Sequence, residues 1–160
     1  MRTMSTIASS GLLFALATGA HADDASDTKH CRTAGNSDRI GACTRRVESL
    51  RQNGTEMERT RSAAAYVLRS MAYFDVRDYD RAIADADEAS RLAPKYTGAH
   101  YMRGAAYGGK KDYDASIAAY TEEIRVSPKL VDAYFARGGD YHRKKNSMIA
   151  LLLTSRRRSS

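Results

Sequence analysis

The sequence predicts an all-α fold, a short α-solenoid of stacked antiparallel helix pairs. The first observation behind this prediction is a constant interval, on which Tyr73, Tyr107 and Tyr141 recur. The second is that apolar residues within each interval are spaced three and four apart, which is typical of amphipathic helices. The third is that Pro94 and Pro128 are separated by the same interval, and proline cannot continue a helix. We therefore expect two full helix-pair units, with a partial unit at each end.

The overall composition fits a single globular domain. The chain has 160 residues, of which 42% are apolar and 28% charged, and its formal net charge is +7. These fractions exclude wholesale disorder, and the length leaves room for one domain. No apolar run reaches the roughly 18 residues that a membrane-spanning helix needs, so we expect no stable membrane insertion.

Residues 1–22 have the layout of a Sec-type signal peptide. Arg2 supplies the positive start, residues 7–18 are small and apolar, and Ala20-His21-Ala22 ends the segment with small residues. Such a segment is removed on export and is too short for a membrane anchor. The alternative is an ordinary buried helix. On the signal-peptide interpretation, the protein is bacterial and periplasmic or secreted.

Export would place the two cysteines in an oxidising compartment. Cys31 and Cys43 lie twelve positions apart, and an even pair in an exported protein is typical of a disulfide. A loop of that size would restrict the unfolded chain by about 3 kcal/mol. No second Cys or His pair accompanies them, as a zinc site would require. The competing interpretation is two buried free thiols.

The first expected helix is a half-unit ahead of the repeats. The stretch from Asp38 to Cys43 echoes the stretch from Asp80 to Asp85 with one residue dropped. It is therefore predicted to be the second helix of a degenerate unit, ending near Leu50. Residues 52–55 form the next turn, because Asn-Gly favours left-handed backbone. Residues 23–62 as a whole are predicted to form a helical N-terminal cap onto which the disulfide pins the preceding arm.

Two full helix pairs follow this cap. The helices are expected over residues 63–76, 79–92, 99–108 and 113–126. Asp112 is the expected N-cap of the last of these, because an aspartate side chain can accept the free N–H groups of a first turn. Gly108 and Gly109, followed by two lysines, break the helix that precedes it.

A helix-turn-helix unit of about 34 residues resembles the tetratricopeptide repeat family. The positions that carry the resemblance are Tyr66, Arg69, Ser70, Tyr73, Ala82, Ala86 and Pro94 in the first unit, His100, Arg103, Gly104, Tyr107, Ser116, Tyr120 and Pro128 in the second, and Tyr134, Arg137, Gly138 and Tyr141 in the third. Arg stands where the family has Leu in all three units, Ser70 replaces Gly, and Ala86 is small where an aromatic residue would pack. The resemblance implies repeats at 63–96 and 97–130 and a partial repeat at 131–145. Secreted bacterial members with a Cys pair ahead of the repeats are similar as well.

The last segment, residues 146–160, does not continue the repeat. One set of codons for Asn146 to Arg156, read one nucleotide earlier, encodes Glu-Leu-Tyr-Asp-Arg-Ala-Ile-Ala-Asp-Phe-Glu, which nearly matches residues 79–85. We therefore hypothesise a frameshift near codon 145. The alternative is a genuine short helix from Met148 to Leu153, with a basic end, that half-covers the exposed last layer.

No motif predicts catalysis, and we expect no enzyme activity, no cofactor and no metal. The stretch from Gly104 to Lys110 has phosphate-loop spacing, but no strand precedes it and Lys111 replaces the Ser or Thr that would hold magnesium. The acidic residues between Asp78 and Glu88 lack the glycine and terminal glutamate of a calcium loop. The Arg-rich stretch before the second repeat lacks the interleaved aromatic residues that stack on bases, so we expect no nucleic acid.

The family resemblance implies a binding groove. In this family the first helices of successive repeats line a concave surface that binds extended peptides or partner helices. The residues at the matching positions are Val67, Met71, Phe74, Tyr101, Phe135, His142 and Arg143. The Lys and Asn with which some relatives clamp a chaperone's C-terminal carboxylate are missing there. The expected function is a non-catalytic interaction module for a protein or peptide partner in the cell envelope. The alternatives are a self-assembling structural component and a fragment of a longer scaffold.

Overall fold

A computed structural model describes residues 29–32, 36–50 and 54–158 of the chain. The predicted signal peptide, residues 1–22, and part of the predicted turn at 52–55 lie outside these residues. A short helical turn at 29–32 is followed by six helices: α2 (Asn36–Leu50), α3 (Glu56–Asp75), α4 (Tyr79–Leu92), α5 (Ala99–Gly109), α6 (Tyr113–Val126) and α7 (Val131–Arg158). The described residues contain no strand.

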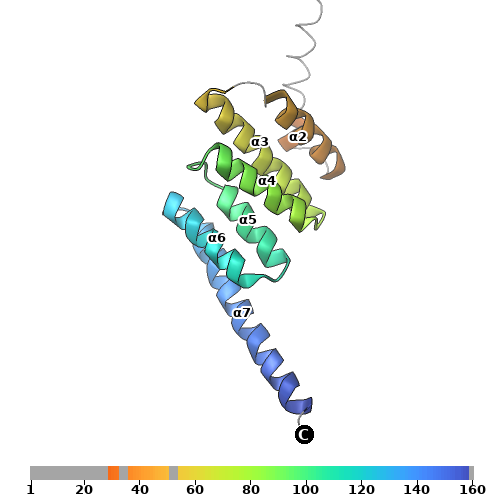
Figure 1. The fold of residues 1–160 in the computed structure, drawn as a ribbon, viewed down its shortest axis with the longest axis vertical. Coiled ribbons are helices and arrows are strands. Elements are labelled where there is room, and N and C mark those ends of the chain that lie inside the picture. The colour runs from red at the N-terminus through yellow and green to blue at the C-terminus, as the bar shows by residue number, and fades with distance from the viewer. Residues whose placement is uncertain (1–28, 33–35, 51–53, 159–160) are drawn as a thin grey trace, which may run out of the picture.

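The helices stack in chain order into one row (Figure 1). Each packs mainly on the helix before it and the helix after it, and α3 also touches α5, which in turn touches α7. This arrangement confirms the predicted all-α solenoid of antiparallel helix pairs. Two pairs, α3 with α4 and α5 with α6, make up the full units, and α2 and α7 flank them at the two ends.

Side-chain caps begin three of the helices. The hydroxyl of Thr55 accepts the backbone N–H of Glu58, whose carboxylate accepts the N–H of Thr55 in return, which is a capping box. Helix α3 therefore starts at Glu56, well before the predicted start at Ala63. Asp78 and Asp112 cap α4 and α6 by accepting the N–H three positions on. The predicted cap at Asp112 is thus present.

The core is built largely from alanine. Ala82, Ala86, Ala89, Ala99 and Ala106 have no exposed surface at all. Alanine has a high helix propensity and a small side chain, so it supports both the helices and their close approach. Larger apolar side chains fill the space that remains between helices, among them Tyr66, Val67, Tyr73, Met102 and Tyr120.

The N-terminal cap is covalently closed. Cys31 and Cys43 form a disulfide and are both buried, with Leu68 of α3 packed against them. Val47 of α2 joins the main core. Helix α2 therefore covers the free side of α3 in place of a preceding repeat.

Helix α7 differs from the sequence-based expectation. The sequence predicts a partial repeat at 131–145 and, as the alternative to a frameshift, a separate short helix from Met148 to Leu153 that half-covers the last layer. In the structure that short helix is not separate, because one unbroken helix runs from Val131 to Arg158 and extends beyond the other helices (Figure 1). No Gly or Pro follows Gly139, so nothing in the local sequence stops the helix, and the segment does not fold back over the solenoid.

None of the helices in the described ranges is both long and apolar enough to cross a membrane.

Candidate peptide-binding groove

A groove of about 550 Å³ follows one side of the solenoid along the first helices of successive units. The residues that line it are Met71, Phe74 and Asp75 of α3, Tyr101, Met102, Ala105, Gly108 and Gly109 of α5, Tyr120 of α6, and Ala136, Asp140 and Arg143 of α7. More than half of these residues carry no charge and no side-chain hydrogen-bonding group. The groove is therefore mainly apolar, with its charged groups near the two ends.

Aromatic side chains form the wall of the groove. The ring of Tyr101 meets that of Tyr120 edge-on, with ring centroids 5.3 Å apart, which is a favourable geometry for aromatic pairs. Gly104 makes this possible, because a Cβ atom there would lie 2.9 Å from the Tyr120 ring. Burial raises the pKa of Tyr120, so its hydroxyl stays protonated and can donate a hydrogen bond at any physiological pH.

Two glycines let neighbouring side chains pack closely against α5 at the floor of the groove. A Cβ atom on Gly109 would lie 2.5 Å from the ring of Tyr79, and one on Gly108 would lie 3.3 Å from the carboxylate of Asp140. Both neighbours therefore pack directly on the α5 backbone. In the sequence these glycines indicate only the end of a helix, whereas in the structure their lack of side chains also shapes the groove.

A buried carboxylate lies at the α7 end of the groove. Asp140 is 1% exposed. Its oxygens lie 2.5 Å from the hydroxyl of Ser116 and 2.7 Å from Nη1 of Arg143. The equivalent positions in the two preceding repeats are Ala72 and Ala106. That replacement of alanine by aspartate is the signal that could have identified Asp140 from the sequence.

The predicted groove residues divide into three groups. Met71, Phe74, Tyr101 and Arg143 line the groove. Val67 is buried in the core cluster with its neighbours from α3, α4 and α5. The remaining two, Phe135 and His142, are exposed side chains of α7 that do not line the groove; Phe135 is 77% exposed.

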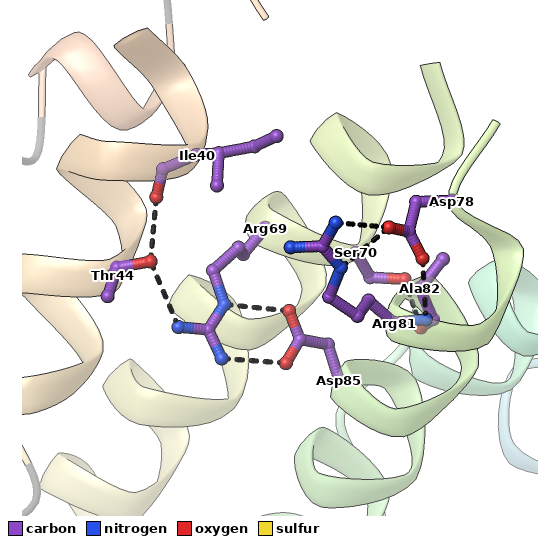
Figure 2. Close-up of polar contacts among 8 residues, drawn as sticks. All are labelled: Ile40, Thr44, Arg69, Ser70, Asp78, Arg81, Ala82 and Asp85. Atoms are coloured by element: carbon purple, nitrogen blue, oxygen red, sulfur yellow. Dashed lines mark hydrogen bonds and ion pairs between the residues drawn. The ribbon is translucent and has the colours of Figure 1, made fainter. Parts of the chain in front are cut away.

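An ion pair fixes the helix that carries Met71 and Phe74. The guanidinium of Arg69 donates to both carboxylate oxygens of Asp85 at 2.8 Å, and its third nitrogen donates to Thr44 at 3.1 Å (Figure 2). These contacts join α3 to α4 on one side and to α2 on the other. The hydrogen bonds with Asp85 raise the pKa of Arg69, so the Arg69 guanidinium stays protonated.

A second contact sets the spacing of α3 and α4. The hydroxyl of Ser70 donates to the carbonyl of Ala82 at 2.7 Å (Figure 2). Ser116 is placed in the same way against the carbonyl of Gly104, also at 2.7 Å, but from the second helix of the next pair. In each pair a small hydroxyl side chain thus replaces direct packing of the two backbones.

The described residues offer no group of three or more His, Cys, Asp or Glu side chains that could hold a metal ion. The acidic residues of α4 and its cap are used otherwise. Asp78 caps α4 and pairs with Arg81, Asp85 pairs with Arg69, and Asp87 pairs with Arg103.

Several solved structures are similar to this chain, among them two tetratricopeptide repeat (TPR) domains. The TPR domain of Arabidopsis OM64 has a TM-score of 0.63 at 15% identity, covering 77% of this chain and 94% of that domain. The second TPR domain of human RPAP3, in complex with the HSP70 peptide SGPTIEEVD, has a TM-score of 0.63 at 17% identity, covering 78% and 97%. The Hsp90 co-chaperone Cns1 from Saccharomyces cerevisiae has a TM-score of 0.72 at 14% identity, covering 89% of this chain and 44% of Cns1.

At sequence identities of 14–17%, the similarity to these solved structures establishes the fold alone.

No curated protein matches the sequence. The family model of the tetratricopeptide repeat matches residues 63–96 and 97–130. These ranges hold the helix pairs α3 with α4 and α5 with α6, apart from the first turns of α3, and they supply most of the residues that line the groove. The chain therefore contains two tetratricopeptide repeats, capped at one end by a disulfide-closed helix and followed at the other by the long helix α7.

Proposed function

We propose that the chain is a non-catalytic protein–protein interaction module that binds a peptide or a helical segment of a partner protein in the groove between α3, α5 and α7. The observation that carries this proposal is the groove itself. Its volume of about 550 Å³ and its aromatic and methionine lining are suited to anchor side chains of a bound segment. The peptide complex of the human RPAP3 domain supports the same use of this fold.

The chemistry of the groove favours a ligand with apolar anchors. Met71 is partly exposed and adaptable, and Phe74 and Tyr101 present rigid rings beside it. Aromatic and methionine side chains accommodate aliphatic and aromatic ligand groups at low entropic cost. The ligand backbone would run along α5, which supplies more of the lining residues than any other helix.

The charges of the groove disfavour an acidic ligand such as the RPAP3-bound HSP70 peptide, which ends in Glu-Glu-Val-Asp. Two carboxylates, Asp75 and Asp140, lie along the groove, and each already pairs with an arginine, Asp75 with Arg39 and Asp140 with Arg143. A ligand carboxylate would therefore have to compete with an acid of the protein for either arginine. We propose a neutral or basic apolar segment as the preferred ligand.

The location of binding is part of the same proposal. Residues 1–22 have a signal-peptide layout, and a disulfide closes the cap beside α2. Disulfides are stable in oxidising compartments. We therefore place the module in the periplasm or outside the cell of a bacterium. Secretion of a reporter enzyme fused behind residues 1–30 tests this placement, and a reporter that stays in the cytoplasm contradicts it.

The binding proposal is tested with a random peptide library displayed against the folded, oxidised chain. We expect enriched peptides to share apolar anchors and to bind the chain in calorimetry. Met71→Glu and Tyr101→Ala should each weaken binding by about ten-fold or more, equivalent to at least ~1.4 kcal/mol, with unchanged helical circular dichroism. The acidic peptide SGPTIEEVD should not bind.

The matched control is Phe135→Ala, which removes an exposed aromatic side chain outside the groove. It should leave peptide affinity unchanged. Enriched peptides that bind the Met71 and Tyr101 variants as tightly as the original chain would show that the groove is not the binding site.

A further inference from the structure

Helix α7 carries most of the large apolar side chains that the described part of the chain exposes. They are Val131, Tyr134, Phe135, Tyr141, Met148 and Ile149. Elsewhere in the described residues the exposed large apolar side chains are single residues on separate turns, such as Met57 and Val76. An accumulation of this kind on one helix is typical of an interaction surface.

The exposed residues share one side of α7, which we call the outer face. Successive residues of a helix are rotated by about 100°, and this places all six within a sector of about 140°. The groove residues Ala136, Asp140 and Arg143 fall in a separate sector on roughly the opposite side. The outer face and the groove are therefore two different surfaces of the same helix.

The repeat shows what is missing from the outer face. Gly138 occupies the position of Gly104 and Ser70 in the preceding units. Gly104 packs against the ring of Tyr120 in α6, and Ser70 donates to a carbonyl of α4. A Cβ atom on Gly138 would meet nothing within 4 Å. In both earlier units this position is covered by an antiparallel helix, so the outer face has the form of a helix-packing surface.

We propose that a second copy of this chain covers the outer face, with the two α7 helices antiparallel about a two-fold axis at the level of Asp140. The apolar residues are distributed evenly about that level, since Val131 and Ile149 are each nine positions from it. A two-fold axis there brings Val131 of each copy beside Ile149 of the other. It also sets Phe135 beside Lys145, which allows a cation–π contact. A surface that is complementary to itself in this way suits a two-fold dimer.

The charge distribution of α7 selects the antiparallel orientation. From Arg143 onward the helix carries Arg143, Lys144, Lys145, Arg156, Arg157 and Arg158 and no acidic residue. A parallel pair would align two such basic halves and repel. An antiparallel pair separates them and places Lys144 and Lys145 beside the first turns of the partner helix, where Asp132 lies. The proposed dimer does not depend on the groove, which stays open in both copies.

The test is the mass of the full, oxidised chain as a function of concentration, by sedimentation equilibrium. We expect a reversible shift from monomer to dimer. Val131→Glu combined with Ile149→Glu should weaken dimerisation by about 100-fold or more, because the two-fold axis brings each new carboxylate beside another one in an apolar interface. Met57→Glu is the matched control, since Met57 is comparably exposed on α3, and should dimerise normally.

Orientation is tested with two single-cysteine additions, Val131→Cys and Ile149→Cys. A mixture of the two variants should form a mixed disulfide under mild oxidation, while neither should cross-link to itself. Self-cross-linking of each variant would overturn the antiparallel pairing. A monomer at every concentration, or a dimer that the Val131 and Ile149 substitutions leave intact, would overturn the proposal. Peptide binding by the monomeric double variant shows that the groove functions separately.

Discussion

The carboxylate of Glu123 in α6 accepts the backbone N–H of Gly98, the N-cap of α5, at 2.8 Å. Its second oxygen accepts the N–H of Tyr101 at 3.1 Å. Gly98 has no side chain with which to cap the helix, and its φ of +98° suits glycine. A fully buried acid from the second helix of the repeat thus closes the N-terminus of the first, next to Tyr101 in the groove.

Replacement of this acid should be strongly destabilising. Glu123→Ala leaves two N–H groups without an acceptor and removes a negative charge from the positive end of a helix. We expect a loss of about 2–4 kcal/mol in the free energy of unfolding, measured by urea denaturation. Glu122→Ala removes an exposed acid at the preceding position and should change stability by less than about 0.5 kcal/mol. Equal losses in the two variants would contradict the capping role.

Two glycines at the same repeat position should respond in opposite ways to alanine. Gly104→Ala would place a methyl group 2.9 Å from the ring of Tyr120, so we expect a loss of about 1–3 kcal/mol from overpacking. Gly138→Ala meets nothing within 4 Å and should stabilise the helix by about 0.5–1 kcal/mol. Thermal unfolding in dilute solution measures both, and a stabilising Gly104→Ala would show that Tyr120 moves freely.

Removing one partner of the Arg69–Asp85 ion pair should lower the free energy of unfolding strongly, whereas replacing both partners with apolar residues should lower it less. Both side chains are largely buried, with 15% and 8% of their surfaces exposed. Arg69→Leu or Asp85→Leu alone leaves one buried charge unpaired, at a cost of about 3–5 kcal/mol. The double variant leaves none and should be more stable than either single variant. A double-mutant cycle in urea tests this, and additive losses would count against coupling.

The constant period of the repeats is enough to predict the fold, because stacking repeats impose the same packing on equivalent positions. Helix α4 spans Tyr79–Leu92 and α6 spans Tyr113–Val126, as predicted. The period of the repeats does not predict where α3 starts. The repeat begins at Ala63, whereas its first helix begins earlier, at Glu56. The capping box of Thr55 and Glu58 marks the true start.

The candidate site is harder to predict than the fold. The family positions identify which residues of α3 and α5 line a groove, as Met71 and Tyr101 do. They do not place Phe135, because no other helix in the described residues packs over that side chain, which is 77% exposed. Tyr120 and Asp140 reach the groove through contacts between helices, which spacing along one helix does not show.

Stability should fall as the pH drops below neutrality, through His100. Burial, together with the charge of Arg103, lowers the pKa of His100, and its Nδ1 lies 3.1 Å from the Arg103 guanidinium. The unfolded chain therefore takes up a proton near its ordinary pKa of about 6.5, before the folded chain does. The free energy of unfolding should decrease from that pH down to the folded-state pKa. Urea denaturation from about pH 7 to about pH 5 measures this, and His100→Gln should flatten the profile. An unchanged profile in the variant would assign the effect elsewhere.

Removal of the disulfide should loosen the cap more than the repeats. Cys31 and Cys43 enclose a short loop, and its closure contributes about 3 kcal/mol on the chain-entropy account. Cys31→Ala with Cys43→Ala avoids burying a polar group and should expose α2 to proteolysis. Helix α2 keeps its contact through Thr44 to Arg69, so it should be loosened rather than released. Hydrogen exchange should show faster exchange in α2 while α4, α5 and α6 change little. Faster exchange throughout these helices would mean that the cap and the repeats unfold as one unit.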